Sequence, residues 1–112
     1  MNSHTNQLQI SGSLLEKSPC RYTPTGLPVV EAVLQHRSQQ QEAGHARQVQ
    51  CQLRLVAIGA VAANLAQAPL DELVQVWGFL AASSREPWRV RLHVCRVETR
   101  QTPANELTLP TL

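Results

Sequence analysis

The sequence is poor in aromatic residues, in lysine and in long apolar runs. Phe, Trp and Tyr together make up 4% of the 112 residues, and Lys17 is the single lysine. No apolar run approaches the about 20 residues that a helix needs to cross a bilayer, so we expect no membrane-spanning segment. The first six residues carry no Lys or Arg and no apolar stretch follows them, which predicts no secretory signal.

Motifs for catalysis and for metal binding are also missing. His4, His36, His45 and His93 are scattered, without the spacing that two histidines need to share a metal ion. The sequence has no Gly-x-Ser-x-Gly motif and no glycine-rich phosphate loop. We therefore expect no enzymatic activity, no metal and no cofactor. A small β-barrel enzyme with a Cys–His nucleophile pair is the catalytic alternative that the sequence leaves open.

The three cysteines, Cys20, Cys51 and Cys95, match no zinc or redox motif in their spacing. Their odd number and the missing secretion signal favour reduced thiols and a cytoplasmic protein. Cys51 and Cys95 lie among apolar residues, so we expect both to be small core residues.

The remaining composition allows one small domain. With 43% hydrophobic and 16% charged residues, the chain can build a single core and is unlike a disordered protein. A large multidomain enzyme does not fit this length. We expect a flexible N-terminus at residues 1–6, a folded domain at 7–100 and a flexible tail at 101–112.

Five segments show the alternation of apolar and polar residues that is typical of β-strands. They cover residues 8–14, 28–38, 47–58, 72–80 and 89–100. Polar residues 39–45 predict the tip of a long hairpin. In the last strand we expect Val90, Leu92, Val94 and Val97 to point inward. Gly78 predicts a bulge, and the change of phase after Val94 predicts another near Cys95 or Arg96.

A short helix is expected between the third and fourth strands. Residues 60–68 are rich in alanine and stop before Pro69. Five strands with little helix between them argue against a parallel α/β sheet. The order of elements predicts an all-β protein, a five-stranded Greek-key barrel of the OB-fold with a short helix between strands three and four. Such barrels bind oligonucleotides.

Basic charge is concentrated in the C-terminal third. Between residues 85 and 100, five arginines stand against two glutamates. Arg89 and Arg91 share one face of the last predicted strand, where they can pair with phosphates. Trp88 lies beside them, and an exposed indole can stack on a base.

Two other segments combine a cation with a ring. Tyr22 follows Arg21 in the first loop, and Arg37 and Arg47 flank the hairpin with His45. Each residue also has an ordinary structural interpretation. A surface arginine is often only solvated, Trp88 can fold back on the core, Tyr22 can anchor its loop, and Trp77 and Phe79 are expected in the core or an interface.

Several short segments together resemble a known family. They begin with Asn6-Gln7-Leu8, Ser11-Gly12 and Pro24-Thr25-Gly26-Leu27-Pro28. The most specific stretch is Val33-Leu34-Gln35-His36-Arg37-Ser38, followed by Gln41-Glu42-Ala43-Gly44, Arg47-Gln48, Cys51-Gln52, Gly78-Phe79 and Leu92-His93. In this order they resemble the primosomal replication protein N (PriB) family of single-strand-binding-like proteins over residues 6–100.

The resemblance implies an OB-fold homodimer that binds single-stranded DNA and helps the restart helicase and other primosome proteins to reload the replisome. Family DNA contacts come from basic and aromatic residues of the hairpin tip and loops, and the matching positions here are Arg21, Arg37, Arg47, Arg85 and Arg89. We expect a DNA site that also includes Tyr22, His45, Trp88 and Arg91, and no membrane partner.

Some positions depart from the family pattern. His45 and Gln50 replace two hairpin aromatics of a well-known branch, and Glu16 stands where a basic residue is expected. Two lost stacking positions at about 1–3 kcal/mol each predict weaker DNA binding, which Trp88 would partly restore. The alternative function is a protein–protein bridging module of the primosome, in which DNA contact is weak or incidental.

Overall fold

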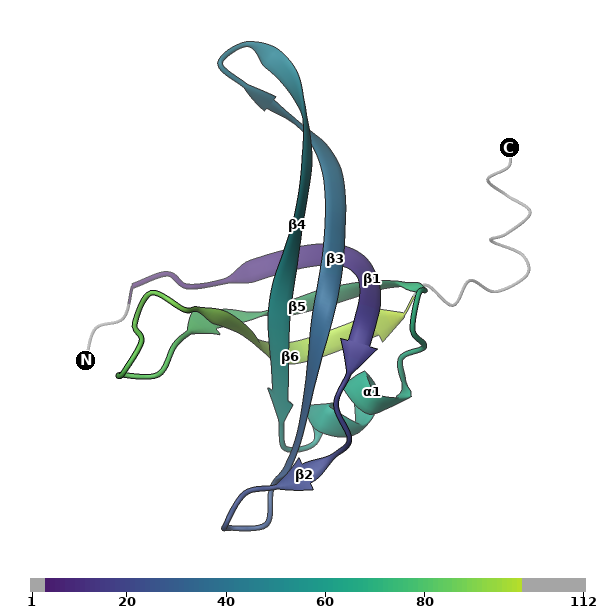
Figure 1. The fold of residues 1–112 in the computed structure, drawn as a ribbon, viewed down its shortest axis with the longest axis vertical. Coiled ribbons are helices and arrows are strands. Elements are labelled where there is room, and N and C mark those ends of the chain that lie inside the picture. The colour runs from purple at the N-terminus through teal and green to yellow at the C-terminus, as the bar shows by residue number, and fades with distance from the viewer. Residues whose placement is uncertain (1–3, 100–112) are drawn as a thin grey trace.

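The structure, a computed structural model, describes residues 4–99, which form six strands and one helix (Figure 1). The strands are β1 (Leu8–Lys17), β2 (Arg21–Tyr22), β3 (Pro28–Glu42), β4 (His45–Ile58), β5 (Leu73–Ala81) and β6 (Arg91–Thr99), and the helix is α1 (Val61–Gln67). The five long strands and the helix match the sequence prediction. The two-residue strand β2, which pairs with the start of β3, was not expected.

The five long strands close into a barrel. Their order is β1-β5-β6-β4-β3, and β1 also pairs with β3, which joins the two edges of the sheet. All of these pairings are antiparallel except that of β4 with β6. This arrangement, with α1 between β4 and β5, confirms the predicted OB-fold.

Glycines allow two close contacts within the barrel wall. β1 leaves β5 and joins β3 near Gly12, where an added Cβ would lie 2.2 Å from the carbonyl oxygen of Gln35. On β5, an added Cβ at Gly78 would lie 2.0 Å from the carbonyl oxygen of His93. The register of β5 and β6 shifts beside Gly78, because Trp77 faces Arg96 and Gly78 faces Val94. Both predicted bulges are therefore one feature, with Cys95 as the extra residue.

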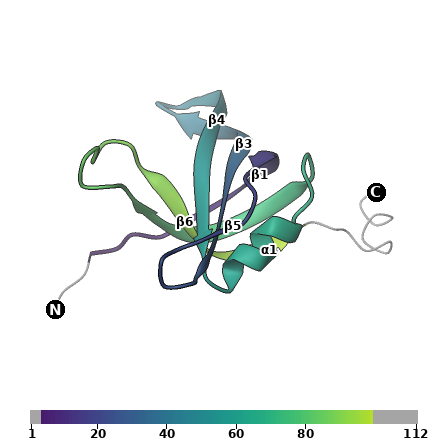
Figure 2. The same cartoon turned by 60° about the horizontal axis from the view of Figure 1, so that its bottom comes forward.

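Aliphatic side chains fill the barrel. Leu14, Leu34, Leu55, Leu65 and Leu92 are fully buried. The helix contributes Leu65 and Ala62 to this core and lies across one end of the barrel (Figure 2). The ammonium group of Lys17 donates a hydrogen bond of 2.7 Å to the carbonyl oxygen of Ala66 and another to Ala68. The chain's single lysine thus satisfies carbonyl groups at the C-terminal end of α1.

A hairpin arm made by the outer halves of β3 and β4 extends far beyond the barrel (Figure 1). The two strands remain paired up to Glu42 and His45, and only Ala43 and Gly44 form the turn. Residues 39–45 do form the polar tip of a long hairpin, as predicted, but the two strands extend further into this tip than expected. Both turn residues have positive φ, as a two-residue hairpin turn requires, and glycine adopts this conformation without strain.

The expectation that three further residues point into the core was wrong. Cys51 and Cys95 are exposed, as is Val90. Cys51 has the inward phase of β4 but lies on the arm, opposite His36, where no barrel covers it. Cys95 follows the buried Val94, so alternation turns its side chain outward, and Val90 precedes β6, which begins at Arg91 rather than at residue 89.

Near the N-terminus, Asn6 extends the pairing of β1 with β5 through its side chain. Its amide group donates a hydrogen bond to the carbonyl oxygen of Leu80 and accepts one from the Leu80 N–H, both at 2.9 Å. Residues 101–112, expected to be a tail, lie outside the described residues.

Candidate nucleic-acid interface

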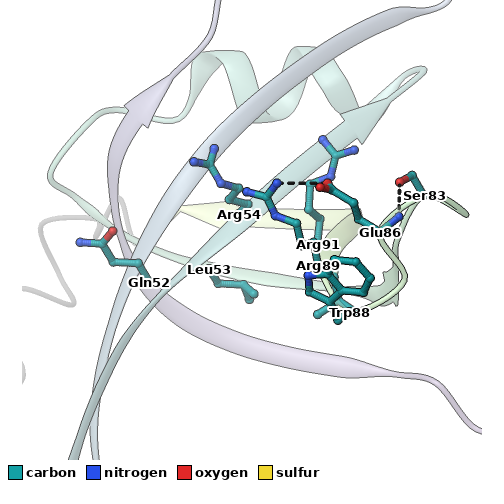
Figure 3. Close-up of a pocket in the computed structure, with 9 residues that line it drawn as sticks. Gln52, Leu53, Arg54, Ser83, Glu86, Trp88, Arg89 and Arg91 are labelled. Atoms are coloured by element: carbon teal, nitrogen blue, oxygen red, sulfur yellow. Dashed lines mark hydrogen bonds and ion pairs between the residues drawn. The ribbon is translucent and has the colours of Figure 1, made fainter.

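A groove of about 590 Å³ runs between β4 and the loop that connects β5 to β6. Arg54, Arg89, Arg91 and Trp88 line it, together with Gln52, Leu53, Ser83, Glu86 and Val90 (Figure 3). Three arginines against one glutamate make its lining basic. We call this site the arginine groove.

The parallel pairing of β4 with β6 brings two of these arginines together. Leu55 and Leu92 face each other in the register, and both side chains are fully buried. Because side chains alternate along a strand, the preceding residues Arg54 and Arg91 both point to the outside of the barrel. The two guanidinium groups therefore come from strands that are distant in sequence. Sequence analysis missed Arg54, although its place on a polar face with Gln48, Gln50 and Gln52 was a usable signal.

Carboxylates hold several of the basic side chains. Glu86 pairs with Arg89 at 3.0 Å and its backbone N–H donates to the hydroxyl of Ser83. Oε2 of Glu31 lies 2.8 Å from Arg21 and 3.6 Å from Arg91. Glu31 thus joins β2 to the arginine groove. These are partly exposed ion pairs, worth about 0–1 kcal/mol each, which a phosphate group can replace.

The predicted aromatic residues are available to a ligand. Trp88 is 72% exposed and does not fold back on the core, and Tyr22 on β2 is 68% exposed. Trp88 lies in the lining of the arginine groove, whereas Tyr22 follows Arg21 outside that lining.

The arm separates residues that the sequence placed together. Arg37 faces Gln50 across the hairpin, while Arg47 faces Gln40 and His45 faces Glu42. The alternation of side chains therefore puts Arg37 on the same outer face as Arg54, and puts His45 and Arg47 on the opposite face.

Arg47 is also paired with Glu42, at 2.7 Å, on that opposite face of the arm. Arg85 is exposed in the loop between β5 and β6 but does not line the groove. Of the nine predicted site residues, the structure brings Arg89, Arg91 and Trp88 into one groove, with Arg21 linked to it and Arg37 on the same face.

Within residues 4–99, no group of three or more His, Cys, Asp or Glu side chains is placed to hold a metal ion. No helix of that part of the chain is long and apolar enough to cross a membrane. The buried core contains no polar or charged side chain among the described residues.

Comparison with known proteins identifies the family. Residues 6–96 match the family described as another single-strand binding protein family. The replication restart protein PriB of Bordetella pertussis is 43% identical over 89 residues, which cover 80% of this chain and 83% of that protein. The chain belongs to the PriB family. This confirms the resemblance predicted from the sequence.

Solved structures agree with this assignment. The structure of PriB from Ralstonia solanacearum has a TM-score of 0.78 at 30% identity and covers 88% of this chain and 100% of its own. The single-stranded DNA binding protein from Thermus aquaticus shares the fold, with a TM-score of 0.69 at 21% identity, over 89% of this chain and 52% of that one.

Proposed function

We propose that this PriB-family chain is a single-stranded DNA-binding accessory protein of the replication-restart primosome, which assists the restart helicase. The observation that carries the proposal is the arginine groove, which Arg54, Arg89 and Arg91 line together with an exposed Trp88. The family name and its single-strand binding description support the same role. The proposed role needs no catalytic group, metal or cofactor, and its place of action is the cytoplasm.

The groove can bind a single strand through charge and stacking. Phosphate groups would pair with the arginines and release counterions, so the affinity must fall as the salt concentration rises. One base would stack on Trp88, which adds about 1–3 kcal/mol. The bases of a duplex already stack on one another and cannot lie flat on this indole. The arrangement therefore favours single-stranded over double-stranded DNA.

We also propose that the protein forms a homodimer, and the free edge of β1 supports this. Among the described residues, the β1 segment 8–12 pairs with β5 on one edge, while pairing of β1 with β3 starts only at Ser13. An edge with unpaired backbone groups is a template for another strand. A second copy that adds its own strand there would cover this edge.

A titration tests the proposed function. Fluorescent oligo-dT of about 35 nucleotides is titrated with the full chain at low and moderate salt, with a duplex of the same length as control. We expect a dissociation constant near or below micromolar at low salt, a steep salt dependence and a preference for the single strand. Binding that is undetectable below about 100 μM would contradict the proposal.

The second candidate function is a bridging module that docks onto other primosome proteins. One observation favours it: the arm, residues 36–53, contains no Phe, Tyr or Trp, so it offers no strong stacking platform. Absence of DNA binding, with retained binding to the restart helicase in moderate salt, would support this function instead.

A further inference from the structure

The outer face of β5 and β6 carries two pairs of side chains that the arginine groove does not use. Trp77 faces Arg96 across the two strands, and the guanidinium carbon lies 4.4 Å from the centroid of the indole ring. Phe79 faces His93, and the two rings are nearly parallel, with an interplanar angle of 9° and centroids 5.3 Å apart. We call these four residues the aromatic ladder.

Trp77 and Phe79 were expected in the core or an interface, and the first of these is wrong because both rings are accessible. Both rings line a groove of about 570 Å³ beside the first residues of β1, and Phe79 is 41% exposed. Gly78 between them faces the interior position of Val94, so alternation turns both rings outward. Partial burial and then the charge of Arg91 lower the pKa of His93, which favours the neutral form of the ring beside Phe79.

The ladder continues the surface of the arginine groove. Arg91, which lines that groove, precedes His93 by two residues, and both point outward from β6. Residues two apart on a strand are about 6.8 Å apart, so Arg91, the Phe79–His93 pair and the Trp77–Arg96 pair follow one another at short intervals. Cations and rings thus alternate along one continuous track, which is the composition of a single-strand binding path.

We propose that a single DNA strand bound in the arginine groove continues over the aromatic ladder, where its bases stack on Phe79 and Trp77 and its phosphates pair with Arg91 and Arg96. This inference rests on the proposed function and extends its site along the outer face of β5 and β6. Arg96 is paired with Glu98, so a phosphate must replace that carboxylate. A short oligonucleotide would fill the arginine groove alone, and a longer one would reach the ladder.

The two tryptophans report on the two parts of this path separately. Trp88→Phe leaves Trp77 as the only tryptophan, and Trp77→Phe leaves Trp88. Each full-length variant is titrated with oligo-dT of about 4 and about 16 nucleotides while its tryptophan emission is recorded. We expect both oligonucleotides to quench Trp88 and only the longer one to quench Trp77.

The affinities provide a second readout. Phe79→Leu and Arg96→Gln should each raise the dissociation constant of the longer oligonucleotide about five- to tenfold and that of the shorter one less than twofold. Leu73→Ala, at an exposed residue of the same strand outside the ladder, is the matched control and should change neither. Thermal unfolding of every variant checks that the barrel is intact.

Three results would overturn the inference. Trp77 fluorescence that stays constant while Trp88 is quenched would show that DNA binds in the arginine groove without reaching the ladder. Ladder variants that bind the longer oligonucleotide normally would show the same. Ladder variants that change the oligomeric state in sedimentation, with no other effect, would mark this face as an interface between two copies. If neither tryptophan is quenched and nothing binds, the proposed function itself fails.

Discussion

Arg21 and Arg91 are joined by one carboxylate oxygen, although they lie in β2 and β6, two strands that are far apart in the sequence. Oε2 of Glu31 lies 2.8 Å from the guanidinium of Arg21 and 3.6 Å from that of Arg91. Both arginines were predicted to bind DNA, so Glu31 occupies positions that phosphate groups would take. It links β2 to β6, and in the proposed function it would compete with the phosphate groups of the ligand.

Glu31→Gln should therefore strengthen DNA binding. The substitution keeps the size of the side chain and frees two guanidinium groups, so we expect a several-fold lower dissociation constant for oligo-dT. The salt dependence should become steeper, by up to about 0.7 in the logarithmic slope for each added phosphate contact. Glu72→Gln, at an exposed residue before β5, makes the same change in net charge and serves as control. Equal effects of the two variants would contradict a local role for Glu31.

Trp88→Ala should weaken DNA binding at least about tenfold, because it removes an exposed stacking platform. Trp88→Phe should retain most of the affinity, since a smaller ring can still stack. Fluorescence anisotropy with labelled oligo-dT measures both variants. Neither should change the midpoint of thermal unfolding, because a side chain with so little burial contributes little to stability. An unchanged affinity of Trp88→Ala would remove Trp88 from the site.

Gly78→Ala should destabilise the fold by about 1–3 kcal/mol or prevent folding. The added Cβ would lie 2.0 Å from the carbonyl oxygen of His93, so β5 and β6 must separate at the bulge. Urea unfolding measures the change, and Gln75→Ala on the same strand is the control, because its half-buried side chain lies away from the bulge. A variant as stable as the wild type would contradict the close contact.

Local patterns in the sequence predicted the fold well, because they record local geometry. Alternation identified the five long strands, Ala-rich residues before Pro69 identified the helix, and a glycine with a change of phase identified the bulge. The same alternation failed for Cys51, since it gives the phase of a side chain but not whether the barrel extends far enough to cover it.

The candidate site was harder to predict because strand pairing assembles it. Arg89 and Arg91 are neighbours in sequence, and their role was expected. Arg54 joins them only because β4 runs parallel to β6, a pairing between distant segments that periodicity does not show. The separation of Arg37 from Arg47 has a related cause. Their faces depend on the register of the hairpin, and the two-residue turn that fixes this register was not predicted.

The stability of the fold should depend on pH through His93. Partial burial and then the charge of Arg91 lower its pKa from the ordinary value of 6.5 in the folded protein. The unfolded chain therefore takes up a proton at a higher pH than the folded chain does. The stabilisation that neutral His93 provides is complete above about pH 6.5 and is lost as the pH falls from there through the folded pKa.

His93→Gln removes this titration, so the difference in free energy of unfolding between wild type and variant should shrink from about pH 7.5 to about pH 5.5. Urea unfolding at several pH values measures it, and an NMR titration of the imidazole gives the folded pKa directly. A difference that stays constant over this range, or an imidazole that titrates at or above 6.5, would contradict the argument. Bound DNA adds a second effect, because protonated His93 would bring a further positive charge to the aromatic ladder. Oligonucleotides long enough to reach the ladder should therefore bind more tightly as the pH falls, whereas short ones should be less affected.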